Sequence, residues 1–128
     1  TATPTMQPFT WTNVNVNMGG WVNTGNVWTI PRTGMYRIHF TAVITSISST
    51  ASKVWFNSEF SNGVTTWYQG LAYGQVTTTL DSQMLTAVQF HALNKGVTFQ
   101  VVMNTVSGTN ISLSPNYGIV DLVWERPA

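Results

Sequence analysis

The sequence predicts an all-β domain, a sandwich or jelly roll of about eight to ten antiparallel strands. Three observations predict it. Apolar and polar residues alternate with a period of two through most of the chain, as in strands that bury one face. Turn signals rich in Gly, Pro and Asn separate these runs at short spacing. Finally, no segment has ten residues of helical period with capping residues.

The elements follow in order along the chain. Residues 1–8 contain Pro4 and Pro8 and are expected to form an extended lead-in or linker, and residues 9–126 a single jelly-roll domain. The apolar phase slips near Thr12–Asn13, which predicts a bulge. The expected strands then cover 27–30, 35–46, 53–60, 64–68, 75–80, 84–93, 97–103, 111–113 and 116–124.

Turns and interruptions divide these strands. Asn62-Gly63 is a strong hairpin signal, and Asn94-Lys95-Gly96 predicts a tight turn. Gly70 and Gly74 are expected to interrupt the chain after the strand at 64–68.

Strand phase predicts the core. In the run 35–46, one phase is apolar and aromatic and should face inward. The run 84–93 is apolar in both phases, so we expect it to be covered on both sides. The expected core residues are Tyr36, Ile38, Phe40, Val88, Phe90, Phe99, Val101, Leu122 and Trp124.

Composition excludes several classes of protein. Nine of 128 residues are charged, and the net charge is +1, whereas about a quarter of the residues of a soluble domain are usually charged. There is no basic excess for binding nucleic acid, and no apolar stretch of about 18 residues that would insert in a membrane. The chain has no cysteine, which removes disulfides, thiolate chemistry and cysteine zinc sites.

The sequence gives little support for an enzyme. His39 and His91 are its only histidines, only four residues are acidic, and the Gly-x-Ser-x-Gly elbow is absent. One histidine per subunit could form a metal or anion site on a trimer axis, but a hydrogen-bonded histidine on a sheet face is the simpler interpretation. We therefore predict a non-enzyme and assign no catalytic residue, no metal ligand and no cofactor.

Three segments, 28–38, 90–99 and 116–123, resemble in order the signature pieces of the C1q/tumour-necrosis-factor-like trimeric jelly roll. The first reads Trp-Thr-Ile-Pro-Arg-Thr-Gly-Met-Tyr-Arg-Ile, like the family's strand, proline, glycine and alternating strand. Val97 follows Gly96 where the family often has an acidic residue, and the few acids do not carry over a calcium site. The resemblance implies a homotrimer. The low charge of the sequence is compatible with a flank that is covered in the trimer. The simpler interpretation is that low charge is a general property of this surface.

Two aromatic clusters are candidate carbohydrate sites, because sugars bind to aromatic platforms flanked by amide or hydroxyl groups. Trp67, Tyr68 and Tyr73 lie among glycines, beside Asn62 in the predicted turn, and loops at sheet ends often carry binding groups. Trp21 and Asn23 follow Gly19-Gly20 in the second cluster. The alternative is that these aromatics fill the core or pack between subunits.

The sequence thus predicts a non-enzymatic trimeric binding head. Its Thr- and Asn-rich composition also resembles that of heads on phage tail fibres and virion spikes, which implies a place on the virion surface or outside the cell. The expected partners are two further copies and a host cell-surface receptor or glycan, bound at three equal sites. A secreted TNF-like lectin and a structural capsid or decoration protein are the alternatives.

Overall fold

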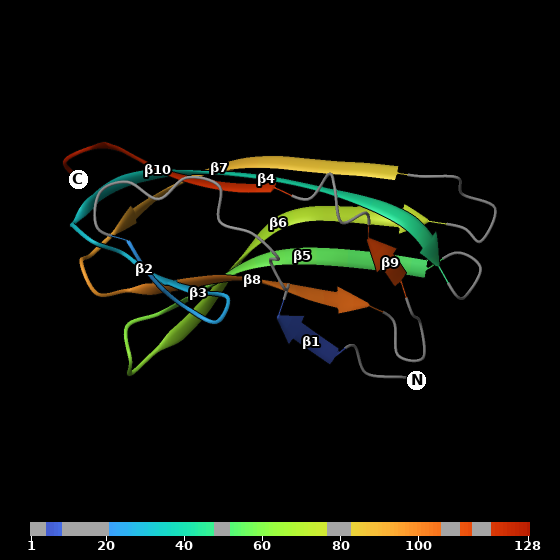
Figure 1. Ribbon diagram of the computed structural model, residues 1–128, viewed down its shortest axis with the longest axis horizontal. Coiled ribbons are helices and arrows are strands. Elements are labelled where there is room, and N and C mark those ends of the chain that lie inside the picture. The colour runs from blue at the N-terminus through green and yellow to red at the C-terminus, as the bar shows by residue number, and fades with distance from the viewer. Residues whose placement is uncertain (1–4, 9–20, 48–51, 77–82, 106–110, 114–118) are drawn as a thin grey trace.

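The computed structural model describes residues 5–8, 21–47, 52–76, 83–105, 111–113 and 119–128 (Figure 1). These residues contain no helix and form ten strands. The strands are β1 (Thr5–Pro8), β2 (Val22–Thr24), β3 (Val27–Thr29), β4 (Gly34–Ile47), β5 (Ser52–Ser61), β6 (Thr66–Val76), β7 (Gln83–Leu93), β8 (Thr98–Thr105), β9 (Ile111–Leu113) and β10 (Ile119–Arg126).

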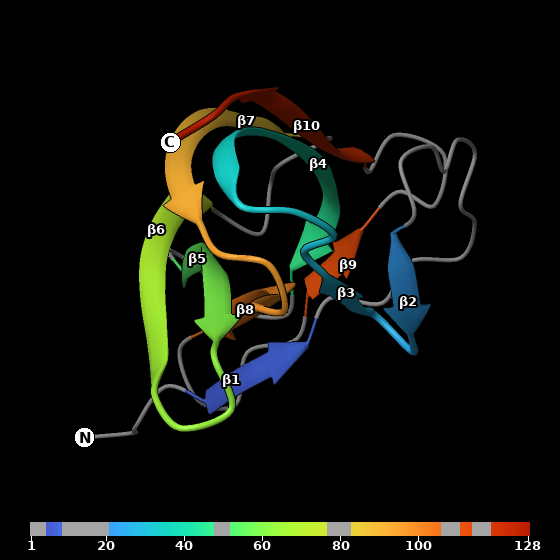
Figure 2. The ribbon, with the colours of Figure 1, turned by 90° about the vertical axis from the view of Figure 1, so that its left-hand side faces the viewer.

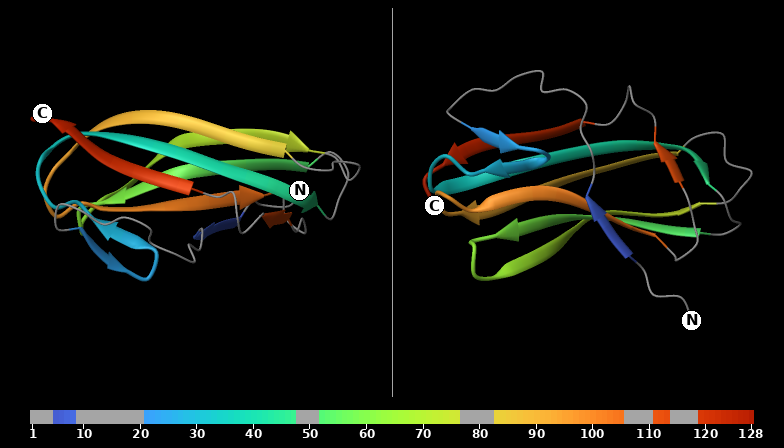
Figure 3. Two further views of the ribbon diagram at one scale, coloured as in Figure 1. Left: turned by 45° about the horizontal axis from the view of Figure 1, so that its top comes forward. Right: turned by 60° about the horizontal axis from the view of Figure 1, so that its bottom comes forward.

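Two antiparallel sheets face each other as a sandwich, which confirms the predicted fold class (Figure 2). The six-stranded sheet has the order β2-β3-β8-β5-β6, and β1 also pairs with β8. The four-stranded sheet has the order β10-β4-β7, and β9 pairs with the far end of β4. Figure 3 shows that β1, within the segment expected as a lead-in, lies alongside β8.

The core lies between the two sheets. Tyr36, Ile38 and Phe40 point inward from β4 and are fully buried, as the strand phase predicts. Phe40 meets Phe56 of the opposite sheet with ring centroids 4.9 Å apart. Phe99 and Val101 are also buried, while Leu122 and Trp124 are partly buried and pack against the same cluster. Seven of the nine expected core residues therefore contact the core.

The expected inward phase of β7 is wrong. Val88 and Phe90 are 53% and 61% exposed and face outward, whereas Leu85 and Leu93 of the other phase are buried. Both phases of this strand are apolar, so alternation alone could not choose between them. Pairing with β4 decides the phase, because Phe90 lies opposite the outward-facing Arg37.

The expected interruption at Gly70 and Gly74 is also wrong, because β6 continues through both glycines. Gly70 pairs with Asn57 and Gly74 with Val54, with a register shift between them. A Cβ at Gly74 would lie 3.1 Å from both methyl carbons of Leu85. Glycine is therefore used here for close packing between the sheets rather than for a turn.

Both predicted turns are confirmed. Residues 62–65 connect β5 to β6, and Gly63 has a φ of 89°. Residues 94–97 connect β7 to β8, with Gly96 at a φ of 90°. The predicted bulge near Thr12–Asn13 lies outside the described residues.

Candidate functional site

The outward side of the four-stranded sheet carries an apolar surface, which we call the apolar face. It is formed by β7 and β10 on either side of β4. Its exposed large side chains are Met84, Val88, Phe90, Ile119 and Val123. The sequence signal for this surface was that both phases of the run 84–93 are apolar. It was missed because Val88 and Phe90 were assigned to the core.

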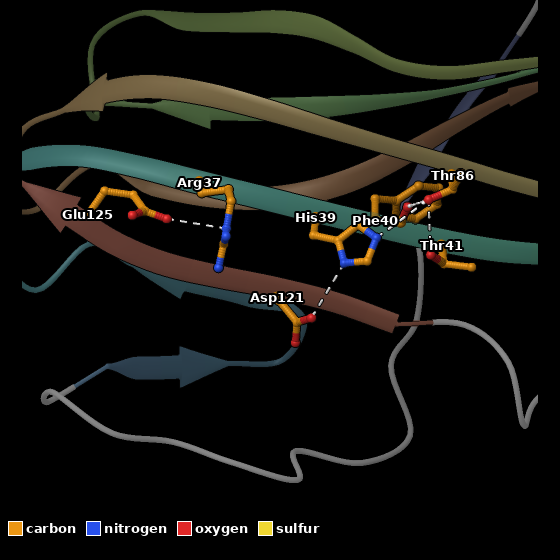
Figure 4. Close-up of polar contacts among 7 residues, drawn as sticks. All are labelled: Arg37, His39, Phe40, Thr41, Thr86, Asp121 and Glu125. Carbon is orange, nitrogen blue, oxygen red and sulfur yellow. Dashed lines mark hydrogen bonds and ion pairs between the residues drawn. The ribbon is translucent and has the colours of Figure 1, made fainter.

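Two polar pairs cross the middle of the apolar face from β4 to β10 (Figure 4). Arg37 Nε lies 3.2 Å from Glu125 Oε1, and His39 Nδ1 lies 3.7 Å from Asp121 Oδ2. On the other side of β4, the Thr86 hydroxyl donates to the carbonyl of Phe40 at 3.2 Å. The charges of Arg37 and Glu125 therefore compensate each other within the face.

The first predicted aromatic cluster is divided between two sides of the six-stranded sheet. Trp67 points inward and stacks on Phe60, with centroids 5.7 Å apart. Tyr68 and Tyr73 point outward and are 44% and 52% exposed. Tyr73 contacts Trp55 of β5, with centroids 5.5 Å apart. We call Trp55, Tyr68 and Tyr73 the outer aromatic row.

Asn62, which the sequence places beside this cluster, holds the β5–β6 turn. Its Oδ1 accepts hydrogen bonds from the backbone N–H groups of Val64 at 2.9 Å and Thr65 at 2.7 Å. The side chain therefore has a structural role, whether or not it also contacts a ligand.

The second predicted cluster is far from the first along the sheet order, at the β2 end. Trp21 is half-buried and packs edge-on against Trp28 and Tyr36, at centroid distances of 6.4 and 5.6 Å. Asn23 is exposed on β2. The structure thus does not bring the two clusters together, and ligand binding at either of them stays a prediction.

A small polar network lies between the sheets, near their edge strands β6 and β7. The buried Ser58 hydroxyl donates to Gln89 Oε1 at 3.3 Å, and His91 Nε2 lies 2.8 Å from the same oxygen. Gln89 Nε2 donates to the carbonyl of Gly70, joining the two edges. Burial lowers the pKa of His91, which favours its neutral form inside the sandwich.

Within the described part of the chain, no three His, Asp or Glu side chains gather as metal ligands. Nor does that part contain a helix long and apolar enough to cross a membrane.

The strand order, the two antiparallel sheets and their shared core define a TNF-like jelly roll, and the solved structures with this fold confirm that resemblance. Murine APRIL at pH 5.0 superposes with a TM-score of 0.71 at 14% identity, covering 98% of this chain and 92% of that one. Murine APRIL at pH 8.0 gives 0.68 at 13% identity, covering 94% and 85%. Eiger TNF from S. frugiperda gives 0.62 at 16% identity, covering 84% and 70%.

At these identities the likeness is one of fold. The sequence matches no protein-family model, and no curated protein sequence matches it significantly.

Proposed function

We propose that this chain is a non-enzymatic binding head that assembles as a homotrimer and recognises a host cell-surface ligand, as part of a phage or viral fibre, spike or tail. The TNF-like jelly roll supports the trimer, because the sequence resemblance to that family implies three copies around one axis. Such a head works on the virion surface or outside the cell.

The apolar face is the observation that carries the proposal. Met84, Val88 and Phe90 form an exposed strip along β7, and Ile119 and Val123 form a second one on β10. Large apolar side chains gathered on one exposed face mark an interaction surface, and here the two strips flank the polar pairs of β4 and β10. A second copy of the chain is the occupant that fits, because the few charges of this face lie in pairs, Arg37 with Glu125 and His39 with Asp121, which limits repulsion between identical faces.

Trimerisation provides a reason for the few charges of the sequence. A covered flank needs no charged residues for solubility, and three copies would present three equal binding sites. Sites that are individually weak then gain avidity when all three engage one cell surface.

Solution mass tests the assembly. One chain has a mass of 14.1 kDa, so a trimer has about 42 kDa, three times that value. We expect light scattering at micromolar concentration to give the trimer for the wild type and the monomer for Phe90→Glu. Tyr73→Glu is the matched control, because Tyr73 is similarly exposed but lies on the other sheet. A monomeric wild type, or a Phe90→Glu variant that is still trimeric, would overturn the assembly through this face.

Cell binding tests recognition. Fluorescently labelled wild-type protein is expected to bind saturably to some members of a panel of bacterial and eukaryotic cells, and the monomeric Phe90→Glu variant to bind far more weakly. If no cell binds the protein but purified capsids do, the chain is a structural decoration protein and the receptor role is wrong.

A further inference from the structure

We propose that the outward side of β5, β6 and β8 is a binding platform for a neutral saccharide, formed by Trp55, Tyr68 and Tyr73 together with Asn57, Asn104 and Glu59. This inference rests on the proposed function, because it names the surface and the ligand class through which the head would recognise a cell.

The aromatic side chains lie at two positions along the length of the strands, which we call levels. Trp55 pairs with Tyr73, and Glu59 pairs with Tyr68. These two levels are four residues apart on β5, or about 13 Å at the usual strand rise of about 3.3 Å per residue. Both tyrosines are about half exposed. Aromatic side chains at this spacing suit the apolar C–H groups of a saccharide that has more than one ring.

Gly70 leaves space between these two levels. It lies opposite Asn57, and a Cβ added at Gly70 would meet a single atom within 4 Å, Asn57 Oδ1 at 3.9 Å. Because Gly70 has no side chain, there is open space at this position between Tyr68 and Tyr73, beside the amide of Asn57. A saccharide of more than one ring, laid across this gap, would contact an aromatic ring at each end and hydrogen-bond to the amide in the middle.

Polar groups line the same surface and are held in place by one another. Asn57 Nδ2 donates to Asn104 Oδ1 at 3.1 Å, and Gln100 Nε2 donates to Glu59 Oε1 at 2.7 Å. The negative charge of Glu59 raises the pKa of the Tyr68 hydroxyl, which also hydrogen-bonds to this carboxylate. Each amide has more donor and acceptor capacity than these bonds use. Sugar hydroxyls, which both donate and accept, match such groups.

The charge of the platform selects among sugars. Glu59 places a carboxylate beside Tyr68, where a sulfated or acidic sugar would be repelled and a neutral hydroxyl could donate to it. The exposed Lys53 lies two residues beyond Trp55 at the other end of β5. The two charged residues, Glu59 and Lys53, thus lie at opposite ends of the platform. We therefore assign the platform to a neutral saccharide.

The platform and the apolar face lie on opposite sides of the sandwich (Figure 2). Assembly through the four-stranded sheet therefore leaves the outward side of the six-stranded sheet open. The three platforms of a trimer then face away from its axis in three directions, and each stays open to a glycan.

Titration of the assembled protein with soluble sugars tests the proposal. The probes are lactose, cellobiose and mannobiose, together with a sulfated disaccharide, and binding is followed by the intrinsic fluorescence of the tryptophans. We expect at least one neutral disaccharide to bind in the millimolar range or tighter and the sulfated one to bind more weakly. Tyr73→Ala and Tyr68→Ala should each lower the affinity by about tenfold.

Gly70→Val provides a steric test. A Cβ fits at Gly70 without a clash, so we expect this variant to keep the trimer and the unfolding midpoint while losing the sugar. Val64→Ala is the control, because Val64 is 94% exposed on the neighbouring turn and outside the platform. Stronger binding of the sulfated sugar, or unchanged affinity in the Gly70 and tyrosine variants, would overturn the platform.

Cell binding separates failure of the platform from failure of the proposed function. If the trimer binds cells and the Gly70→Val variant binds equally well, the head recognises its ligand elsewhere and the platform is wrong. If the wild type is monomeric and binds no cell, the proposed function itself is wrong.

Discussion

The guanidinium carbon of Arg32 lies 3.3 Å from the ring centroid of Trp124, directly over the indole. Trp124 Nε1 in turn donates to the carbonyl of Thr33 at 3.4 Å. The last strand is thereby fixed to the turn that precedes β4, by a cation–π contact and a hydrogen bond. This contact positions β10, and with it Ile119 and Val123 of the apolar face.

Gly34 should be indispensable next to this contact. A Cβ at Gly34 would clash with the Trp124 indole and lie 2.7 Å from the carbonyl oxygen of Arg126. We expect Gly34→Ala to lower the free energy of unfolding by about 1–3 kcal/mol, as overpacking typically does. Urea unfolding at fixed protein concentration measures this loss. Gly70→Ala is the matched control and should change stability by less than about 1 kcal/mol, and equal losses in the two variants would contradict the packing argument.

Trp67→Ala should lower the stability of the fold, because Trp67 packs against the core and is not part of the exposed platform. Trp67 stacks on the buried Phe60 and is only partly exposed. Its truncation is expected to lower the free energy of unfolding by between about 1 and 3 kcal/mol, less than for a fully buried ring. Tyr68→Ala, on the adjacent outward position, should change stability much less. Thermal melting of both variants decides the matter, and a Trp67→Ala protein as stable as the wild type would place Trp67 among the free surface residues.

Asn62→Ala should weaken the β5–β6 hairpin by about 1 kcal/mol, because two backbone N–H groups lose their acceptor. Asn62→Asp keeps an oxygen at the same place and is expected to retain most of the stability. Chemical denaturation of the two variants gives the comparison. Equal losses would mean that the side-chain acceptor is not what holds the turn.

Stability should fall as the pH falls from 7.5 to 5.5, in part through His91. Burial lowers the pKa of His91 below its ordinary value of about 6.5. Between these two pKa values the unfolded state binds a proton that the folded state does not, so acidification favours unfolding. The loss begins near the unfolded pKa and levels off below the folded one.

Urea unfolding at several pH values measures this dependence. His91→Gln should flatten it, and since His39 is present in both proteins, the difference between them reports His91 alone. An identical pH dependence in the variant would rule out this origin.

The sequence predicted β4 correctly because only one of its phases is strongly apolar. Tyr36, Ile38 and Phe40 alternate with Arg37, His39 and Thr41, so one face of the strand could be buried at low cost. The Asn62-Gly63 hairpin was equally local, since its turn depends on residues that are neighbours in the chain.

The candidate site was predicted only in part. Tyr68 and Tyr73 were named from the sequence, but Trp55, Asn57 and Asn104 of the same surface were not, because they come from two strands separated by almost fifty residues. Trp55 and Asn57 share the outward phase of the run 53–60, but Asn104 comes from β8, and a search for aromatic clusters along the chain does not combine the two strands.

Alternation and turn chemistry by themselves determined that this chain forms strands, where most of them turn, and which side of β4 is buried. Only the tertiary structure decided which side of β7 meets the core and that β6 continues through its glycines. The reason is that both depend on segments that are distant in the sequence and lie close together only in the fold. Val88 and Phe90 face outward because pairing with β4 sets their phase, and Gly74 is needed because Leu85 comes from the other sheet.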